Sequence, residues 1–234
     1  MAKIISNKYL GQDIHVMKIE GNFKGEMGQF YMVRSWDNYP VLSRPLSIHD
    51  IDDEGISFLY RVVGDGTKNF SKLEVNDEIK LEGPYGNGFP KVEGKVLLVG
   101  GGMGVAPLYL TAKRVSKLED VEKLDVFMGF REKEMLKGEY EKYADNVHIN
   151  VGGIITDDVD VDKYDYIFTC GPEIMMEKLV KMAKGKDTKV YVSIEKRMAC
   201  GIGACLVCTC KTKDGNKKTC KDGPVFLGED VFYE

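Results

Sequence analysis

Four cysteines near the end of the chain limit its possible structures more than any other feature. Three of them stand in the pattern C-x4-C-x2-C and one follows at a distance: Cys200, Cys205, Cys208 and Cys220. This is the plant-type spacing for four thiolates around a [2Fe-2S] cluster. Gly201 and Gly203 suit a loop that curls around such a group, because glycine tolerates unusual backbone angles and adds no bulk. The pattern therefore predicts an electron carrier.

Two other uses of these cysteines compete with the cluster. A structural zinc site also takes four cysteines, although its ligands usually come as two close pairs in the sequence. Disulfides are disfavoured because the first three cysteines crowd one loop and the first residues do not resemble a signal peptide. Cys210 lies two positions beyond Cys208. Residues 206–210 alternate as in a strand, and we interpret Cys210 as a free thiol rather than a ligand.

Length and charge limit the possible partners. The 234 residues allow one large domain, or two modest ones with an appendage. A net charge of -4 gives no basic excess, so we expect no nucleic-acid partner. No apolar run approaches the roughly 20 residues that a membrane-spanning helix requires. We therefore expect a cytoplasmic protein without a membrane partner.

The first part of the sequence has the pattern of short strands. Ile56, Phe58, Tyr60 and Val62 alternate with other residues, as in a strand with one face in a core. Residues 14–19, 29–34 and 78–81 are further candidates, and glycines and asparagines punctuate them. Short strands without long helices between them predict a small antiparallel β-barrel over residues 1–94.

From Lys95 onward the pattern changes to alternating strands and helices. Residues 95–99 form an apolar run, which is typical of a strand covered on both faces. Four more strands are expected at 124–128, 147–151, 165–169 and 189–194, with amphipathic helices at 108–118 and 172–184. This alternation predicts a parallel sheet with helices on both faces over residues 95–195, followed by a cluster-binding tail over 196–234. The predicted fold class is thus β plus α/β.

Two strand-to-helix turns of the second domain are candidates for binding an anion. The first is glycine-rich, with Gly100, Gly102, Gly104 and Pro107, and the second is Cys170, Gly171 and Pro172. Such turns present backbone N–H groups and a helix N-terminus to a phosphate. Val105 occupies the place of the last glycine of G-x-G-x-x-G, and a tight turn needs glycines even without a ligand. Both turns follow strands of a parallel sheet, whose carboxyl ends commonly bind ligands.

The order and spacing of four motifs identify a family resemblance that spans nearly the whole chain. The motifs are Arg44-Pro-Leu-Ser47, Gly64-Asp-Gly-Thr67, the two turns Gly100 to Pro107 and Cys170 to Pro172, and the cysteine tail ending in Asp222-Gly-Pro-Val-Phe226. The chain resembles the ferredoxin-NADP reductase superfamily. Within it, the chain is most similar to the electron-transfer subunits of the two-subunit, NAD-linked (type B) dihydroorotate dehydrogenases.

The resemblance implies a site for FAD on the barrel. Arg44 would pair with the pyrophosphate through its planar guanidinium. Ser47 would hydrogen-bond near the flavin N5, with Pro45 and Leu46 between them on the same strand. Leu46 stands where many members of the superfamily carry a tyrosine against the flavin. The remaining residues implied at the FAD phosphates are Gly64, Gly66 and Thr67.

The resemblance also implies that NAD(H) binds at the two turns of the second domain. Cys170 would lie beside the nicotinamide, and we assign it no nucleophilic role. After the second strand of this domain, Arg131 or Lys133 would favour a 2'-phosphate and Glu132 would repel it. The residues alone leave NAD and NADP open, and the resemblance favours NADH.

The cofactors together imply a path for electrons. Nicotinamide gives two electrons as hydride and a cluster takes one at a time, so a flavin stands between them. No side chain is required as an acid or base, and we assign no catalytic residue. The implied partner is an FMN-containing subunit that oxidises dihydroorotate to orotate in pyrimidine synthesis, with two copies of each chain in a heterotetramer.

Two alternatives remain open at this point. The first is a small NAD(P)H-reductase subunit of another flavin and iron-sulfur complex, of the transhydrogenase or sulfide dehydrogenase type. The second is a nucleotide-sensing module with a four-cysteine zinc site. The four-cysteine tail favours the dihydroorotate system.

Overall fold

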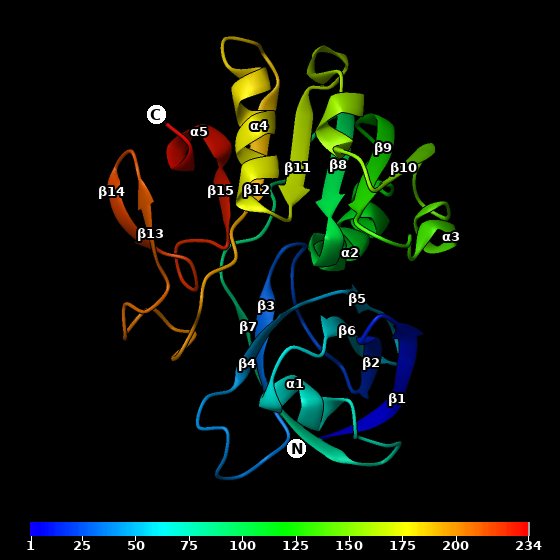
Figure 1. The fold of residues 1–234 in the computed structure, drawn as a ribbon, viewed down its shortest axis with the longest axis vertical. Coiled ribbons are helices and arrows are strands. Elements are labelled where there is room, and N and C mark those ends of the chain that lie inside the picture. The colour runs from blue at the N-terminus through cyan, green and yellow to red at the C-terminus, as the bar shows by residue number, and fades with distance from the viewer. Residues whose placement is uncertain (234) are drawn as a thin grey trace.

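The N-terminal part of the protein is a β-barrel that closes through one short segment (Figure 1). The computed structural model describes residues 1–233. The barrel contains β1 (Ala2–Gly11), β2 (Ile14–Glu20), β3 (Phe30–Arg34), β4 (Arg44–Ser47), β5 (Asp50–Ile51), β6 (Gly55–Arg61), β7 (Glu78–Tyr85) and the short helix α1 (Asp65–Phe70). The strands are antiparallel in the order β4-β3-β7-β1-β2-β6-β5. Because β4 and β5 are nearly continuous, residues 44–51 join the two edges of the sheet, and the predicted antiparallel barrel is confirmed.

Alternation along β3 gives this strand two different environments. Tyr31 and Val33 point into the barrel core, together with Ile56 and Phe58 of β6. Phe30 and Met32, the neighbours on the opposite face, are buried outside the barrel against the cysteine-rich segment. Successive side chains of β3 point to opposite faces, and both faces are buried. β3 therefore links the barrel core to the cysteine-rich segment.

The second part is a sheet with helices on both faces. Its parallel strands are β8 (Gly94–Gly101), β9 (Val121–Phe130), β10 (Asn146–Val151), β11 (Tyr166–Cys170) and β12 (Lys189–Ser193). The helices are α2 (Val105–Val115), α3 (Lys137–Tyr140) and α4 (Glu173–Ala183), with short 3-10 turns at Gly102–Gly104, Ile155–Asp158 and Val161–Lys163. The strand order is β10-β9-β8-β11-β12-β15, in which β15 (Val225–Leu227) comes from the cysteine-rich segment.

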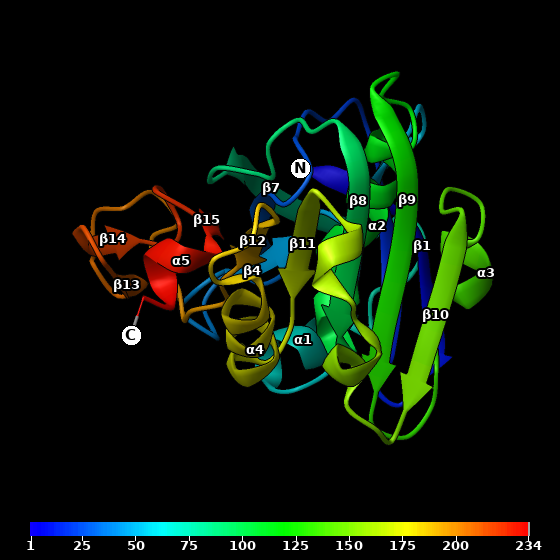
Figure 2. The ribbon, with the colours of Figure 1, turned by 90° about the horizontal axis from the view of Figure 1, so that it is seen from above.

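The two faces of this sheet have separate cores. Leu98 of β8 packs with Leu108 of α2 on one face, whereas Leu97 packs with Leu179 of α4 on the other. Figure 2 shows α4 and α2 on opposite sides of the strands. Adjacent residues of β8 thus enter different cores, which explains why its sequence is an uninterrupted apolar run. The predicted parallel sheet with helices on both faces is confirmed.

The cysteine-rich segment forms a hairpin and then returns to the sheet. Its elements are β13 (Thr209–Thr212), β14 (Gly215–Lys218), β15 (Val225–Leu227) and α5 (Gly228–Val231). β15 adds to β12 as an antiparallel edge strand, so part of the predicted tail belongs to the nucleotide sheet. The expected strand over residues 206–210 is wrong for its first half. Leu206 has a φ of 61°, and the chain curls through the cysteine loop before the strand begins at Thr209.

Helix α2 attaches the sheet to the barrel. Lys113 Nζ lies 2.7 Å from Asp50 Oδ1 in β5, and Arg114 donates to the carbonyl oxygen of Gly25 at 2.6 Å. Nearer the start of the helix, the buried ring of His49 donates from Nδ1 to the carbonyl oxygen of Ala106 at 2.9 Å. Within residues 1–233, no helix has the length and apolar character needed to cross a membrane.

Candidate functional site

The four cysteines of the C-x4-C-x2-C tail lie close together as two pairs with different exposure. Cys200 interacts with Cys205, which is exposed, and Cys208 interacts with Cys220, both of which are buried. All six cysteines of the chain are free thiols. Within residues 1–233, no group of three or more His, Cys, Asp or Glu side chains is arranged around a single metal-ion position. A cluster of two irons, each taking two thiolates, fits a site of two pairs.

Backbone N–H groups favour the ionised form of the exposed pair. The N–H of Ile202, followed by those of Cys205 and Ala204, outweighs partial burial and lowers the pKa of the Cys200 thiol to about 6. Gly203 donates its N–H to Cys220 Sγ at 3.1 Å, and Cys220 donates its own to Cys208 Sγ at 3.4 Å. Burial, with the adjacent Cys208, nevertheless raises the pKa of Cys220 to about 12. An iron between these buried sulfurs would supply the positive charge that two thiolates need there.

The glycines of the loop are required by its geometry. Gly201 has a φ of 73° and Gly203 a φ of 83°, a region that side chains rarely adopt. A Cβ on Gly201 would lie 2.7 Å from Met32 Cγ, and one on Gly203 would lie 2.9 Å from Lys221 Cδ. Both positions therefore need glycine for backbone shape and for room.

The predicted flavin motifs come together although 20 residues separate Arg44 from Gly64 in the numbering of the chain. Arg44 begins β4, and Gly66 lies in the first turn of α1, beside β4 in Figure 1. A Cβ on Gly66 would lie 2.5 Å from Arg44 Nε, so only glycine lets the guanidinium approach. The guanidinium also lies 5.4 Å from the ring centre of Trp36. This contact holds a cation beside the N-terminal turn of α1.

The other flavin candidates have mixed environments. Thr67 accepts hydrogen bonds from the N–H groups of Val63 and Gly64 at 2.9 and 3.2 Å, so its hydroxyl shapes the turn. Leu46 is 9% exposed and packs in the barrel core, whereas Pro45 and Ser47 are only partly buried. The strand therefore leaves Arg44, Pro45 and Ser47 accessible and keeps Leu46 largely inside.

The two nucleotide-type turns lie against each other at the carboxyl ends of neighbouring strands. Cys170 pairs with Gly100 across β11 and β8. A Cβ on Gly104 would collide with the carbonyl oxygen of Cys170, and one on Gly101 would lie 2.7 Å from Pro172 Cδ. Burial raises the pKa of the Cys170 thiol strongly, and the thiol is 1% exposed. A thiol held neutral in this way is consistent with the absence of a nucleophilic role.

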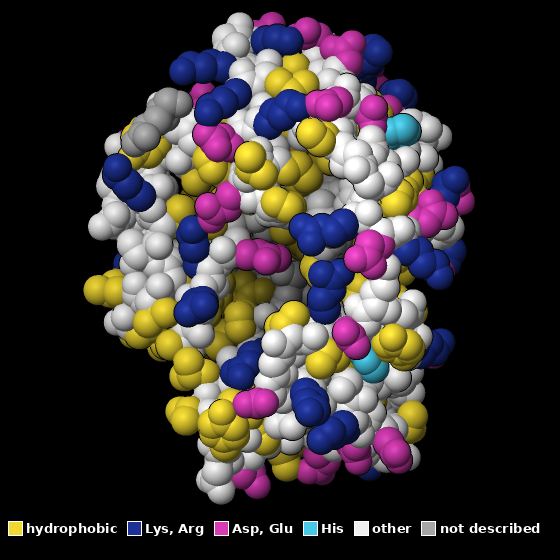
Figure 3. Space-filling model, in the orientation of Figure 1, with side chains coloured by type: hydrophobic (Ala, Val, Ile, Leu, Met, Phe, Trp, Pro, Cys, Tyr) yellow, Lys and Arg dark blue, Asp and Glu magenta, His cyan; other side chains and the backbone are white. Residues whose placement is uncertain are grey.

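A cavity of about 1030 Å³ opens over these turns. Figure 3 shows the hollow between the upper and lower parts of the molecule, with Lys and Arg side chains at its margin. Gly101, Gly102 and Pro172 line it, which places the two predicted turns in one crevice. Arg44, Ser47 and Thr67 are not among the residues that line it.

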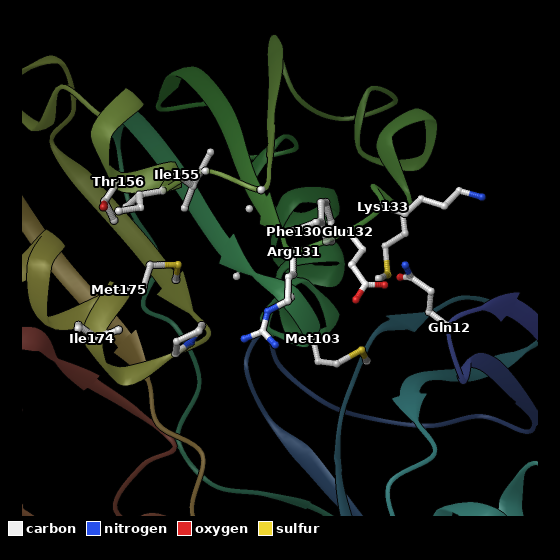
Figure 4. A pocket seen from close by; sticks show the side chains of 18 of the residues that line it. Gln12, Met103, Phe130, Arg131, Glu132, Lys133, Ile155, Thr156, Ile174 and Met175 are labelled. Carbon is white, nitrogen blue, oxygen red and sulfur yellow. The ribbon is translucent and has the colours of Figure 1, made fainter.

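The wall of the cavity includes the three charged residues that follow the second strand of the domain. Arg131, Glu132 and Lys133 follow β9, and all three line the cavity (Figure 4). Gln12, from the turn between β1 and β2, faces them from the barrel. Gln12 was not predicted as a site residue from the sequence. Its φ of 52° marks a tight hairpin turn, but no local pattern indicates that the turn reaches the second domain.

The fold and these sites define a flavin- and nucleotide-type reductase with an added cysteine site. Ferredoxin-NADP reductase from Neisseria gonorrhoeae matches 82% of this chain with a TM-score of 0.66 at 13% identity, which shows the shared fold. The structure of an NADH-dependent reduced ferredoxin-NADP oxidoreductase matches 99% of this chain and 89% of that chain, with a TM-score of 0.88 at 28% identity.

Sequence comparisons narrow the class to one family. The family model for the iron-sulfur cluster binding domain of dihydroorotate dehydrogenase B matches residues 195–232. The electron transfer subunit of dihydroorotate dehydrogenase B (NAD(+)) from Clostridium acetobutylicum is 48% identical, over 98% of this chain and 96% of that protein. The corresponding subunit from Clostridium perfringens is 44% identical, over 99% and 97%. The chain belongs to the family of dihydroorotate dehydrogenase B electron transfer subunits, and the predicted family is confirmed.

Proposed function

We propose that this chain passes electrons between NAD(H) and the catalytic subunit of a dihydroorotate dehydrogenase through FAD and a [2Fe-2S] cluster. The observation that carries the proposal is the convergence of three sites in one chain of this family. These are the Arg44 and Gly66 contact, the cavity over Gly101 and Pro172, and the four-cysteine site. When bound, a flavin exchanges hydride on one side and single electrons on the other.

The chain's own residues would hold the flavin and the nucleotide. Arg44 would pair with the FAD pyrophosphate, assisted by backbone N–H groups from Gly64 to Thr67, while Pro45 and Ser47 would face the ring. Gly100, Gly102, Gly104 and Pro107 would shape the nucleotide turn, and Cys170, Gly171 and Pro172 would bound the nicotinamide. Cys200, Cys205, Cys208 and Cys220 would ligate the irons. The partner would be an FMN-containing subunit in a cytoplasmic heterotetramer, and the domains would be 1–94, 95–195 and 196–234.

The absorption spectrum of the purified protein tests this proposal against a zinc-bound nucleotide sensor. Flavin and iron-sulfur bands at one FAD and two irons per chain are the expected result. A colourless protein that contains zinc would contradict it. Co-purification with a neighbouring chain that carries FMN would identify the acceptor, and a different flavoenzyme in that position would favour the transhydrogenase type.

NADH is the expected nucleotide, because the relatives at 48% and 44% identity are named for NAD(+) and because Glu132 lines the cavity beside Arg131 and Lys133. A carboxylate accepts hydrogen bonds from ribose hydroxyls and repels a 2'-phosphate. We expect Glu132→Gln to raise kcat/KM for NADPH about tenfold, which corresponds to relief of about 1.4 kcal/mol of charge repulsion.

Steady-state assays with both nucleotides measure this effect. Lys133→Gln is the comparison variant, because it removes a charge of opposite sign from the adjacent residue, which also lines the cavity. If wild type already prefers NADPH, or if both variants change the preference equally, the assignment to Glu132 is wrong.

A further inference from the structure

The two cysteine pairs face different surroundings. Cys208 and Cys220 are 1% and 2% exposed, and they pack with Phe30 and Met32 of β3, each 3% exposed. Tyr85 of β7 and Met198 complete the same cluster. Cys205, in contrast, is exposed. One side of the site is therefore dry and the other is open to solvent.

The dry side faces the strand that carries the flavin motif. Phe30 is paired with Ser47 across β3 and β4, and Met32 is paired with Pro45. Tyr85 is paired with Phe30 from the other neighbouring strand, and their ring centres lie 6.0 Å apart. We refer to Phe30, Met32 and Tyr85 as the β3 wall. This wall stands one strand away from Arg44 to Ser47.

The cysteine loop lies directly on this wall. A Cβ on Gly201 would lie 2.7 Å from Met32 Cγ and 3.5 Å from Tyr85 Cδ2, so no water fits between loop and wall at this point. The returning segment is fixed to the end of β7 as well. Asn87 Nδ2 donates to the carbonyl oxygen of Asp222 at 3.0 Å, and Val225 donates its N–H to the carbonyl oxygen of Asn87 at 3.3 Å.

We propose that Met32, with Phe30 and Tyr85, is a positioning residue that seals the flavin-facing side of the iron-sulfur cluster and holds its reduction potential at a low value. The proposal rests on the function proposed above. A cluster with four thiolates becomes more negative on reduction, and water stabilises the more highly charged state. A wall that keeps water from Cys208 and Cys220 therefore disfavours reduction. The wall residues form and break no bond; a bound cluster would accept one electron from a reduced flavin, which would be oxidised by one electron.

The test compares cluster potentials in the full chain loaded with FAD and iron. Met32→Ala opens the wall at Gly201, and we expect the potential, measured by an EPR-monitored redox titration, to shift to a less negative value. Loss of iron to a chelator should accelerate about tenfold, because removing support around a metal site has effects of this size. Met32→Leu keeps an apolar side chain of similar volume and should restore both values.

Two controls separate this effect from general destabilisation. Val33→Ala shortens the adjacent residue of β3, which points into the barrel core, and should leave the potential unchanged. Leu206→Ala trims a side chain on the open side that is already 63% exposed, and should also leave it unchanged.

The outcomes show whether the proposed function or only the proposed role of the β3 wall is wrong. If the wild-type chain takes up no iron-sulfur cluster, the proposed function fails. If the wild type is loaded but Met32→Ala matches Val33→Ala in potential and in iron loss, only the role of the wall is wrong. If Met32→Ala retains no cluster, Met32→Val provides the same comparison, because it leaves a smaller cavity at the wall. An unchanged cluster potential in Met32→Val would overturn the proposal.

Discussion

Arg44 shows how a single contact connects two motifs that are separate in the sequence. Its guanidinium occupies the space that a side chain on Gly66 would fill, and Trp36 supports it from another side. The glycine is therefore needed for the arginine, as well as for any phosphate that binds near it. A planar cation fixed beside a helix N-terminal turn is suited to a pyrophosphate.

Arg44→Ala should weaken FAD retention without unfolding the barrel. The lost hydrogen bonds to a charged phosphate contribute about 1.5–3 kcal/mol, so FAD should bind about ten- to a hundredfold less tightly. Flavin content after gel filtration measures the effect, and far-UV circular dichroism checks the fold. Lys68→Ala, which removes an exposed cation from α1, the helix beside Arg44, is the control. Unchanged flavin content in Arg44→Ala would count against the assignment.

Cys210 is separated from the ligand set by its packing. Its side chain lies in the core shared with α4, whereas Cys208 and Cys220 lie against β3. We expect Cys210→Ser to retain the iron content and the reduced-state EPR signal, although burial of a hydroxyl there should lower stability by about 1–3 kcal/mol. Cys220→Ser should lose or destabilise the cluster. A dispensable Cys220 with an essential Cys210 would show that the ligand set is wrong.

At the scale of elements, α2 fixes the barrel to the sheet through His49. Its ring stacks on Tyr109 with centres 4.7 Å apart and donates to Ala106 in the first turn of the helix. Burial lowers the pKa of His49, against smaller opposing contributions from the Ala106 carbonyl, Asp50 and Glu139. The folded-state pKa is thus below the unfolded value of about 6.5, so the unfolded chain binds more protons in acid.

Stability should therefore fall as the pH decreases below about 6.5, and His49 should account for part of this loss. His49→Phe keeps the stacking but cannot be protonated. We expect this variant to lose about 1 kcal/mol at pH 7.5 from the missing hydrogen bond and to show a smaller decrease between pH 7 and pH 5 than wild type. Urea unfolding across this range gives both values. Parallel pH profiles for the two proteins would exclude His49 as the cause.

Strands and helices with a regular spacing of apolar residues were predictable from the sequence. Elements that form only by pairing with distant segments were not. β8 and α4 were expected because buried apolar runs and helical spacing are local signals. β1 was missed, because residues Ala2–Gly11 mix polar and apolar side chains without regular alternation, and they form a strand by pairing with β2 and β7. β15 was missed for the same reason, since three residues become a strand only against β12.

The site residues also fall into two groups, those with a specific local spacing and those placed only by distant contacts. The cysteines carry a spacing that is specific to their chemistry, and they were named from it. Gln12 lies in a barrel turn that reaches the cavity only through the packing of two domains. Met32 is an ordinary apolar residue in a strand, and only the folded structure places it on the cysteine loop. Residues that act through distant contacts have no signal in a single sequence.

At the scale of the whole molecule, the flavin and the cysteine site should be separable in function. Hydride transfer needs the nicotinamide against the flavin and makes no use of iron. We therefore expect Cys205→Ser, if it retains FAD, to undergo normal flavin bleaching with NADH. Transfer between NADH and the FMN of the catalytic subunit should decrease by orders of magnitude, because electron tunnelling is slow across the distance that the cluster would bridge.

Rapid-mixing absorbance follows the two flavins in this experiment. Binding of the catalytic subunit must be measured separately, because the cysteine loop also exposes Ile202, Leu206 and Val207. Cys210→Ser is the matched cysteine control. A cluster-free complex that assembles normally and passes electrons at the wild-type rate would show that the route does not run through Cys200 to Cys220.

β15 lies near the end of the chain, so the edge strand β12 remains uncovered during most of synthesis. β12 ends at Ser193, and the strand that covers its free edge begins only at Val225. During synthesis the five parallel strands are therefore complete while one edge still has unpaired N–H and C=O groups. Such edges pair readily with other chains. A message that ends early, or a ribosome that stalls in the cysteine loop, would thus release a protein prone to aggregate, and the cell's chaperones would meet this chain at that stage.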